Sequence, residues 1–189
     1  MRRITQNQRE NIVLNAAILV ADYGEETERE IGITKGGVKF TVTETVRDIE
    51  FDGRRGKTKG MEVVDEIDAA FETATLELSQ ENILLALVAA EQGESDEITN
   101  TDGGVIPDTR YLQNITAFGI CNKTSKFKKI TLYNPGAAGG LEIATADKGE
   151  ATVPLKINAH WDMDVAEGTP HNIYKIEDDT TGPDNGAGA

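Results

Sequence analysis

The amino-acid sequence predicts a mainly β protein, an antiparallel β-sandwich or barrel with one short α-helix packed beside it. The strongest observation is the stretch 153–165, in which every odd-numbered residue is hydrophobic and the residues between them are polar or proline. Apolar and polar residues also alternate over 38–43, with Val46 in the same parity, and a period of two places alternate side chains on one face of a strand. Only residues 80–91 combine a helical pattern with start and stop signals.

The chain has 189 residues, a length typical of one domain. We expect residues 1–9 to form a polar N-terminal arm and residues 10–177 to form the domain. The run 12–20 is apolar on both faces, so its periodicity does not separate a buried strand from a helix. Residues 22–32 are acidic and have the composition of a turn.

The next predicted element is a pair of long strands joined by a basic loop. The first strand includes residues 38–46, and at Ile49 the apolar residues change to the other parity. This change predicts a β-bulge near Arg47–Asp48, because one extra residue moves every later side chain to the opposite face. Residues 53–60 form a basic, glycine-bounded loop. A long strand with a second irregularity is expected over about residues 63–78.

The predicted helix covers residues 80–91. Ser79 is a good N-cap, Glu81 lies in the first turn, and Gly93 follows as a stop signal. We expect an acidic loop over residues 91–104. The helix has an apolar stripe formed by Ile83, Leu84, Leu87 and Val88.

The second half of the chain predicts more strands, with a turn at Asn134–Gly136. Pro154 cannot donate a ladder hydrogen bond, so the start of the strand over 153–165 is expected at an edge or outside the main pairing. The acidic, glycine-rich segment 178–189 is expected to be flexible. The other predicted strands cover about residues 110–121, 127–133, 141–146 and 172–177.

The composition excludes several classes of function. Asp and Glu number 33 against 19 Lys and Arg, which gives a formal charge of −14 and a pI of about 4.5. This balance argues against general nucleic-acid binding, which requires a basic face. The one cysteine cannot form an internal disulfide, and no apolar run approaches the roughly 18 residues of a membrane span. The N-terminus does not have the pattern of a signal peptide.

No residue pattern predicts an enzyme, a metal site or a cofactor. Gly56-Lys57-Thr58 is similar to the end of a phosphate-binding loop, but Phe51 stands where that loop needs its first glycine. His160 lies beside Asp162, yet a metal site needs three or four converging ligands, so a surface histidine is the better interpretation. Cys121 lies near several lysines, and its strand parity favours a small core residue over a reactive thiol.

Four stretches together resemble a known family. They are Leu14–Leu19 followed by an acidic turn, Ile33–Phe40 with Gly36-Gly37 at a strand entry, the strand–helix unit 71–91, and 145–149 leading to 157–164. In this order they resemble the major tail proteins, or tail tube proteins, of long-tailed, non-contractile bacteriophages. The resemblance spans roughly residues 10–177, and the acidic segment after Lys175 has no counterpart in the family.

The resemblance implies a β-sandwich flanked by a helix, with six subunits joining their sheets into a ring and rings stacking into a tube. It also implies a tape measure protein inside the tube during assembly, and tail terminator and distal tail proteins at its ends. DNA would pass through without specific binding. The chain would then be a structural protein of the virion tail, present in the host cytoplasm during assembly, and not an enzyme.

Two other interpretations remain open at this stage. A tube subunit of a phage-derived particle, such as a pyocin or gene-transfer agent, has the same sequence features. A monomeric β-sandwich binding module, such as an adhesin or carbohydrate-binding domain, usually presents clustered aromatic residues, which make up only 5% of this chain.

Specific residues follow from the first interpretation. We expect the basic loop to mediate contacts between subunits, and the net charge of −14 predicts a predominantly negative channel lining. The candidate inter-subunit residues are Arg54, Arg55, Lys57 and Lys59, and the candidate core anchors are Phe40, Leu84, Ile157 and Trp161.

Overall fold

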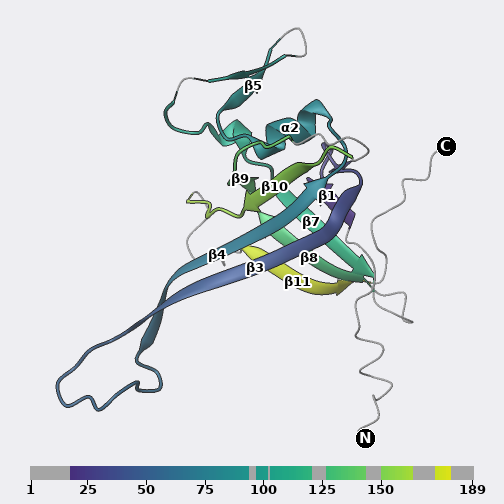
Figure 1. The fold of residues 1–189 in the computed structure, drawn as a ribbon. Helices are drawn as coiled ribbons and strands as arrows, with labels where there is room; N and C mark the ends of the chain where they lie inside the picture. Colours follow the sequence, from purple (N-terminus) through teal and green to yellow (C-terminus); the bar gives the residue numbers. More distant parts are fainter. Residues whose placement is uncertain are drawn as a thin grey trace, which may run out of the picture.

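Two antiparallel sheets lie face to face around the core, with one short helix beside them (Figure 1). The structure, a computed structural model, confirms the predicted mainly β fold, with one α-helix among the residues described. A long two-stranded arm extends from one end of the sandwich, and a smaller hairpin lies beyond the helix at the other. The structure describes residues 18–93, 97–101, 103–120, 127–143, 150–163 and 173–179.

The first sheet has five strands in the order β11-β8-β7-β1-β2. The predicted strand 127–133 is confirmed as β8, and part of the apolar run 12–20 forms β1. β11 reaches Asp179, so the first two residues of the segment expected to be flexible belong to the sheet instead. The expected arm 1–9 and the rest of the C-terminal segment lie outside the described residues. The strands are β1 (Ile18–Ala21), β2 (Arg29–Glu30), β7 (Asn114–Ile120), β8 (Phe127–Tyr133) and β11 (Tyr174–Asp179).

Opposite charges align between β8 and β11. Lys129 lies across from Glu177 in the register, and its Nζ is 2.6 Å from the Glu177 carboxylate. Lys128 pairs in the same way with Asp178, and Lys175 is a second partner of Glu177. Hydrogen bonds from Lys129 and then Lys175 lower the pKa of Glu177, because they stabilise its charged form. The lysines at the start of β8 thus hold the acidic end of β11 on the sheet.

The second sheet has four strands in the order β3-β4-β10-β9. Its longest strand, β3, pairs only with β4 among the described residues, so the other edge of its 15 residues carries no strand. Pro154 pairs with β4 on one side, and β9 reaches only Ile157 and Asn158 on the other, which agrees with the predicted edge position. The strands are β3 (Thr34–Asp48), β4 (Glu62–Thr75), β9 (Gly136–Ala137) and β10 (Val153–Asn158).

The core lies between the two sheets. In the four-stranded sheet, alternate residues of β3, β4 and β10 face this core, and the residues between them form a polar outer face. Large apolar side chains from both sheets are completely covered, which is how the period of two stabilises the sandwich. The fully buried residues include Leu19, Ile115 and Leu132 from one sheet and Phe71, Leu155 and Ile157 from the other.

The two irregularities in the long strands lie elsewhere than predicted. Thr45 pairs with Glu66 and Val46 with Val64, so the extra residue is Asp65 in β4, not a residue near Arg47–Asp48 in β3. β3 keeps its alternation past Val46, so Ile49 lies on the opposite face of the arm, and the parity changes because both faces of the arm carry exposed apolar residues outside the core. The second shift is at Gly36 and Gly37, whose positive φ angles of 87° and 82° suit glycine.

Helix α2 (Gln80–Ala86) begins as predicted, with Ser79 Oγ accepting from the N–H of Asn82 at 3.3 Å. The helix was predicted to end at residue 91, but it ends five residues earlier, at Ala86. Leu87 is extended and Ala90 already begins β5. β5 (Ala90–Gln92) and β6 (Ile98–Asn100) form a hairpin where a loop was expected. A 3-10 turn, η1 (Asp108–Arg110), precedes β7 and occupies the predicted start of that strand.

Two other predicted strands are wrong in extent. β10 ends at Asn158 instead of continuing to residue 165, and residues 164–165 lie outside the described part of the chain. No strand occupies residues 141–143, while residues 144–146 are not described. The predicted turn at Asn134–Gly136 is confirmed, with a positive φ of 46° at Asn134.

Candidate functional site

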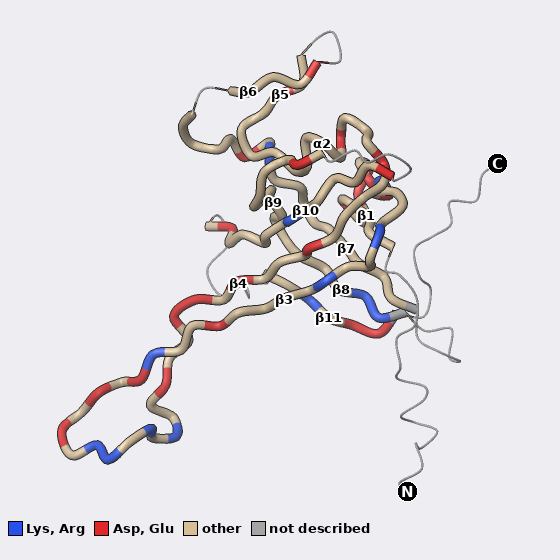
Figure 2. The backbone as a smooth tube through the Cα atoms, viewed as in Figure 1, with Lys and Arg blue, Asp and Glu red and all other residues tan. Residues whose placement is uncertain are grey.

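The basic loop lies at the tip of the arm formed by β3 and β4. The two strands pair as far as Asp48 and Glu62, and the N–H of Ile49 donates to the Met61 carbonyl at 2.8 Å. Residues 49–61 therefore form the end of the arm, far from the core (Figures 1 and 2). All four predicted residues, Arg54, Arg55, Lys57 and Lys59, lie on this tip, where Figure 2 shows Lys and Arg positions in blue close together along the backbone.

These four side chains have different surroundings. Arg54 pairs with Asp48 and donates from Nε to the Gly56 carbonyl at 2.8 Å, so it holds the loop together. Lys57 lies 3.3 Å from Glu62. Arg55 and Lys59 are exposed and make no ion pair with any described residue. The sequence predicted the same inter-subunit role for all four residues. The structure shows that Arg55 and Lys59 have no ion pair with a described residue, so these two are available to bind a partner.

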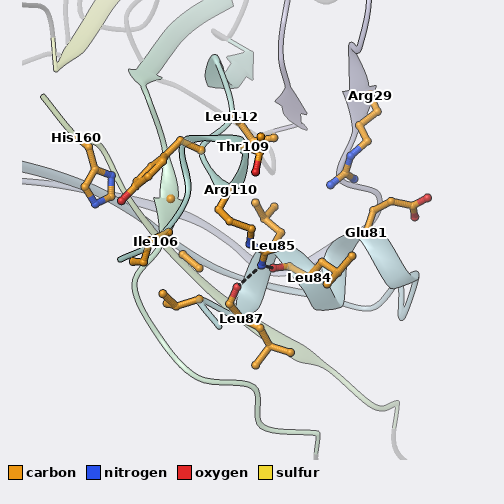
Figure 3. Close-up of a pocket in the computed structure, with 14 residues that line it drawn as sticks. Arg29, Glu81, Leu84, Leu85, Leu87, Ile106, Thr109, Arg110, Leu112 and His160 are labelled. Carbon is orange, nitrogen blue, oxygen red and sulfur yellow. Dashed lines mark hydrogen bonds between the residues drawn. The ribbon is translucent and has the colours of Figure 1, made fainter. Parts of the chain in front are cut away.

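A pocket of about 210 Å³ lies between α2, η1 and β9 (Figure 3). Helix α2 is at the end of the sandwich opposite the arm. Glu81 lies at the pocket, exposed to solvent. The apolar lining includes Leu84, Leu87, Val88, Ile106, Leu112 and Ala137.

Two arginines also line this pocket, and both are tied to protein acceptors. Arg110 donates from Nη2 to the carbonyls of Leu84 and Leu87, at 3.2 and 2.7 Å (Figure 3). Arg29 donates to the Asn82 side-chain oxygen at 3.1 Å. The Leu84 carbonyl also accepts from the Leu87 N–H at 3.2 Å, so Arg110 is its second donor, and it is a donor to the Leu87 carbonyl as well. No local signal in the sequence predicts this contact, because Arg110 is distant along the chain.

Trp161 is not a core anchor, and that prediction is wrong. Its side chain is 52% exposed, because β10 ends at Asn158 and the chain leaves the sheet. The N–H of His160 donates to the Tyr133 carbonyl at 3.3 Å, so the alternation between faces ends before Trp161. Trp161 instead lines a shallow hollow with Tyr111 and Met163.

The other predicted anchors occupy three different environments. Ile157 is completely buried, as expected. Phe40 is partly buried against the core, with its ring 5.6 Å from that of Phe71 and 5.7 Å from that of Tyr174. Leu84 is half-buried and lines the α2 pocket instead of the centre of the core.

The histidine expected on a strand surface lies just past the end of β10. His160 Nδ1 is 3.1 Å from the Asn134 carbonyl, and its ring packs edge-on against Tyr111. Among the described residues, no three His, Cys, Asp or Glu side chains gather as metal ligands would. Cys121 and His171 lie outside the described residues.

No family model matches the chain, and no curated protein matches it. Within the described residues, no helix has the length and apolar character needed to cross a membrane. The candidate functional features are the arm tip, the α2 pocket and the edge of β3 that is unpaired among the described residues.

Proposed function

We propose that this chain is a structural subunit of a bacteriophage tail tube, which assembles into stacked hexameric rings that conduct viral DNA into the host. The sequence resemblance to major tail proteins of long-tailed phages supports the proposal. The mainly β fold with one flanking helix is compatible with it. The same assembly in a phage-derived particle would use the same interfaces.

The unpaired edge of β3 is the observation that carries the proposal. Its 15 residues present a long row of backbone groups, and natural proteins normally shorten, cover or pair such an edge to avoid aggregation. The edge strand β11 on the other sheet is also unpaired on one side among the described residues. Pairing with neighbouring copies around a closed ring would satisfy these edges without leaving any exposed.

The outer face of the four-stranded sheet suits a water-filled channel. The register places Thr41, Thr43 and Thr45 of β3 on this face, and the charged side chains that share it among the described strand residues are four bases and four acids, counting Asp65, which Arg47 binds. Lys39 binds Glu72 at 2.7 Å, so much of this charge is already paired. The charged set has a net charge of 4 − 4 = 0 per copy and consists of Lys35, Lys39, Arg47, Lys156, Asp65, Glu66, Asp68 and Glu72.

A channel lined by this face would be hydroxyl-rich and close to neutral, with its charges mostly paired. DNA would gain little counterion-release energy at such a wall, so it could slide through the tube. This face would not supply the predominantly negative lining expected from the sequence, because its acids and bases are equal in number. The tape measure protein would occupy this channel during assembly, and tail terminator and distal tail proteins would close the tube ends.

A monomeric binding module is the second candidate, and one observation favours it. Trp161 is exposed beside Tyr111 in a hollow that also contains Asp108 and Asp162, an arrangement found where sugars stack on aromatic rings. In a monomeric module, a long unpaired edge strand would favour aggregation, so the binding module is the second candidate.

Electron microscopy of the purified protein tests the proposal. Rings with six-fold symmetry, or tubes built from them, are the expected result. Monodisperse monomers at high protein concentration, measured by sedimentation velocity, would contradict it and favour the binding module.

A further inference from the structure

The tip of the arm carries apolar side chains that nothing in the described structure covers. The side chains of Ile49, Phe51 and Met61 lie far from the core, and they are 39%, 46% and 42% exposed. Ile49 and Met61 are opposite each other on one face of the arm. Contiguous exposed apolar groups on a soluble protein mark a contact with another molecule, and Phe51 is the largest of the three.

The α2 pocket has the size and chemistry to receive such a side chain. Its volume is about 210 Å³, and six of its 14 lining residues are leucine, isoleucine or valine. An apolar cavity of about 150 Å³ in another protein binds benzene, so a pocket of this size holds a phenyl ring. The guanidinium groups of Arg29 and Arg110 already donate to protein oxygens, although the Nε of Arg110 is buried without a hydrogen-bond partner among the described residues.

The charges around the two features are complementary. Residues 53–60 contain four basic residues and no acidic one, and Arg55 and Lys59 make no ion pair with a described residue. The segment 22–30 contains five acids and one base, and Arg29 ties it to α2 through Asn82. Glu81 adds an exposed carboxylate at the pocket itself. Glu50 and Asp52 flank Phe51, so the whole tip, residues 49–61, has a net charge of 4 − 2 = +2, which is still opposite in sign to the acidic surroundings of the pocket.

The arm and the pocket lie at opposite ends of one molecule, so the arm cannot fill its own pocket (Figure 1). We propose that Phe51 of one copy inserts into the α2 pocket of the next copy, with Arg55 and Lys59 beside its acidic rim. This contact joins two different surfaces, and such head-to-tail contacts repeat from copy to copy along an assembly. The inference rests on the proposed self-assembly and names the surface on which the arm docks.

Two full-length variants test the contact. Phe51→Ser removes the inserted ring, and Val88→Trp fills the pocket from its own wall. Each variant alone should raise the protein concentration needed for end-to-end assembly by at least about tenfold, since a central aromatic anchor dominates a contact of this kind. Val64→Ser is the matched control, because Val64 is 50% exposed on the other face of the arm and should leave assembly unchanged.

The decisive experiment mixes the two variants in equal amounts. The intact arm of the Val88→Trp protein can enter the intact pocket of the Phe51→Ser protein, so paired species should appear that neither variant forms alone. These pairs are double rings if the protein forms rings and 1:1 dimers if it does not, so sedimentation and electron microscopy separate this inference from the hexameric proposal. If Val88→Trp does not fold by circular dichroism, Ile106→Trp replaces it.

Normal assembly of either variant would overturn the inference. That result would also be expected if the pocket bound a small apolar ligand and not Phe51. Loss of assembly by both folded variants without pairing in the mixture would overturn it as well. A disulfide between Phe51→Cys on one copy and Val88→Cys on another, in a Cys121→Ser background, is the expected direct result.

Discussion

Replacing Ile157 and Trp161 by alanine should have unequal effects on stability, although both residues share the apolar parity of the same segment. Ile157 is completely buried opposite Phe71. Its truncation removes three carbon atoms, worth about 2.4 kcal/mol at about 0.8 kcal/mol per buried methylene, and the unfilled space adds to this cost. We expect Ile157→Ala to lower the free energy of unfolding by about 3–4 kcal/mol.

Trp161→Ala should cost less, because the Trp161 side chain is 52% exposed. About half of a tryptophan surface of roughly 200 Å² is then covered, which at about 25 cal/mol per Å² is worth at most ~2.5 kcal/mol. Unfolded chains already cover part of that surface and alanine retains part of it, so we expect about 1–2 kcal/mol.

Urea denaturation of dilute, unassembled protein measures both values. Far-ultraviolet circular dichroism is the suitable signal, because Trp161 is the only tryptophan and one variant lacks it. Equal losses for the two variants would refute the reasoning and return Trp161 to the core.

Three further predictions concern charged residues. The double variant Arg55→Glu/Lys59→Glu should block assembly in sedimentation assays. It should leave the urea midpoint unchanged, because neither side chain has an ion-pair partner in the described structure. Arg54→Glu should instead increase the protease sensitivity of the arm, because Arg54 binds Asp48 and the Gly56 carbonyl. The pKa of Glu177 is lowered by its lysine partners, so its pairing stabilises the fold above about pH 4.5 and is lost as pH falls through the lowered value; Glu177→Gln should flatten this part of the urea midpoint against pH. Arg110→Met should lower the free energy of unfolding by about 1–3 kcal/mol in urea titrations, and an unchanged value would show that the two carbonyl bonds contribute nothing.

Local patterns in the sequence correctly predicted those features that depend on neighbouring residues in the chain and not on contacts with distant segments. The period of two placed Ile157 in the core, and Ser79 placed the start of α2. The end of α2 was missed because Leu87 is extended and Ala90 already pairs in β5, and no local stop signal in the sequence marks that change before Gly93. The end of β10 was missed because the chain leaves the sheet before Trp161, and alternation continues in the sequence after pairing has stopped.

The candidate site was only half predictable for similar reasons. The charges and glycines of residues 53–60 indicated an exposed basic loop, and the structure places that loop at the tip of the arm. The sequence did not separate Arg54, held by Asp48, from Arg55, which has no partner in the described residues. The α2 pocket combines segments that are distant in sequence, so no spacing of residues could reveal it.

The most direct test of the central claim is cryo-electron microscopy of the assembled protein at a resolution that separates strands. The proposed function predicts six-fold rings in which the free edge of β3 pairs with a neighbouring copy and the outer face of the four-stranded sheet, with Thr41, Thr43 and Thr45, lines the channel. An assembly in which the β3 edge stays unpaired, or a channel lined mainly by lysine and arginine, would contradict it.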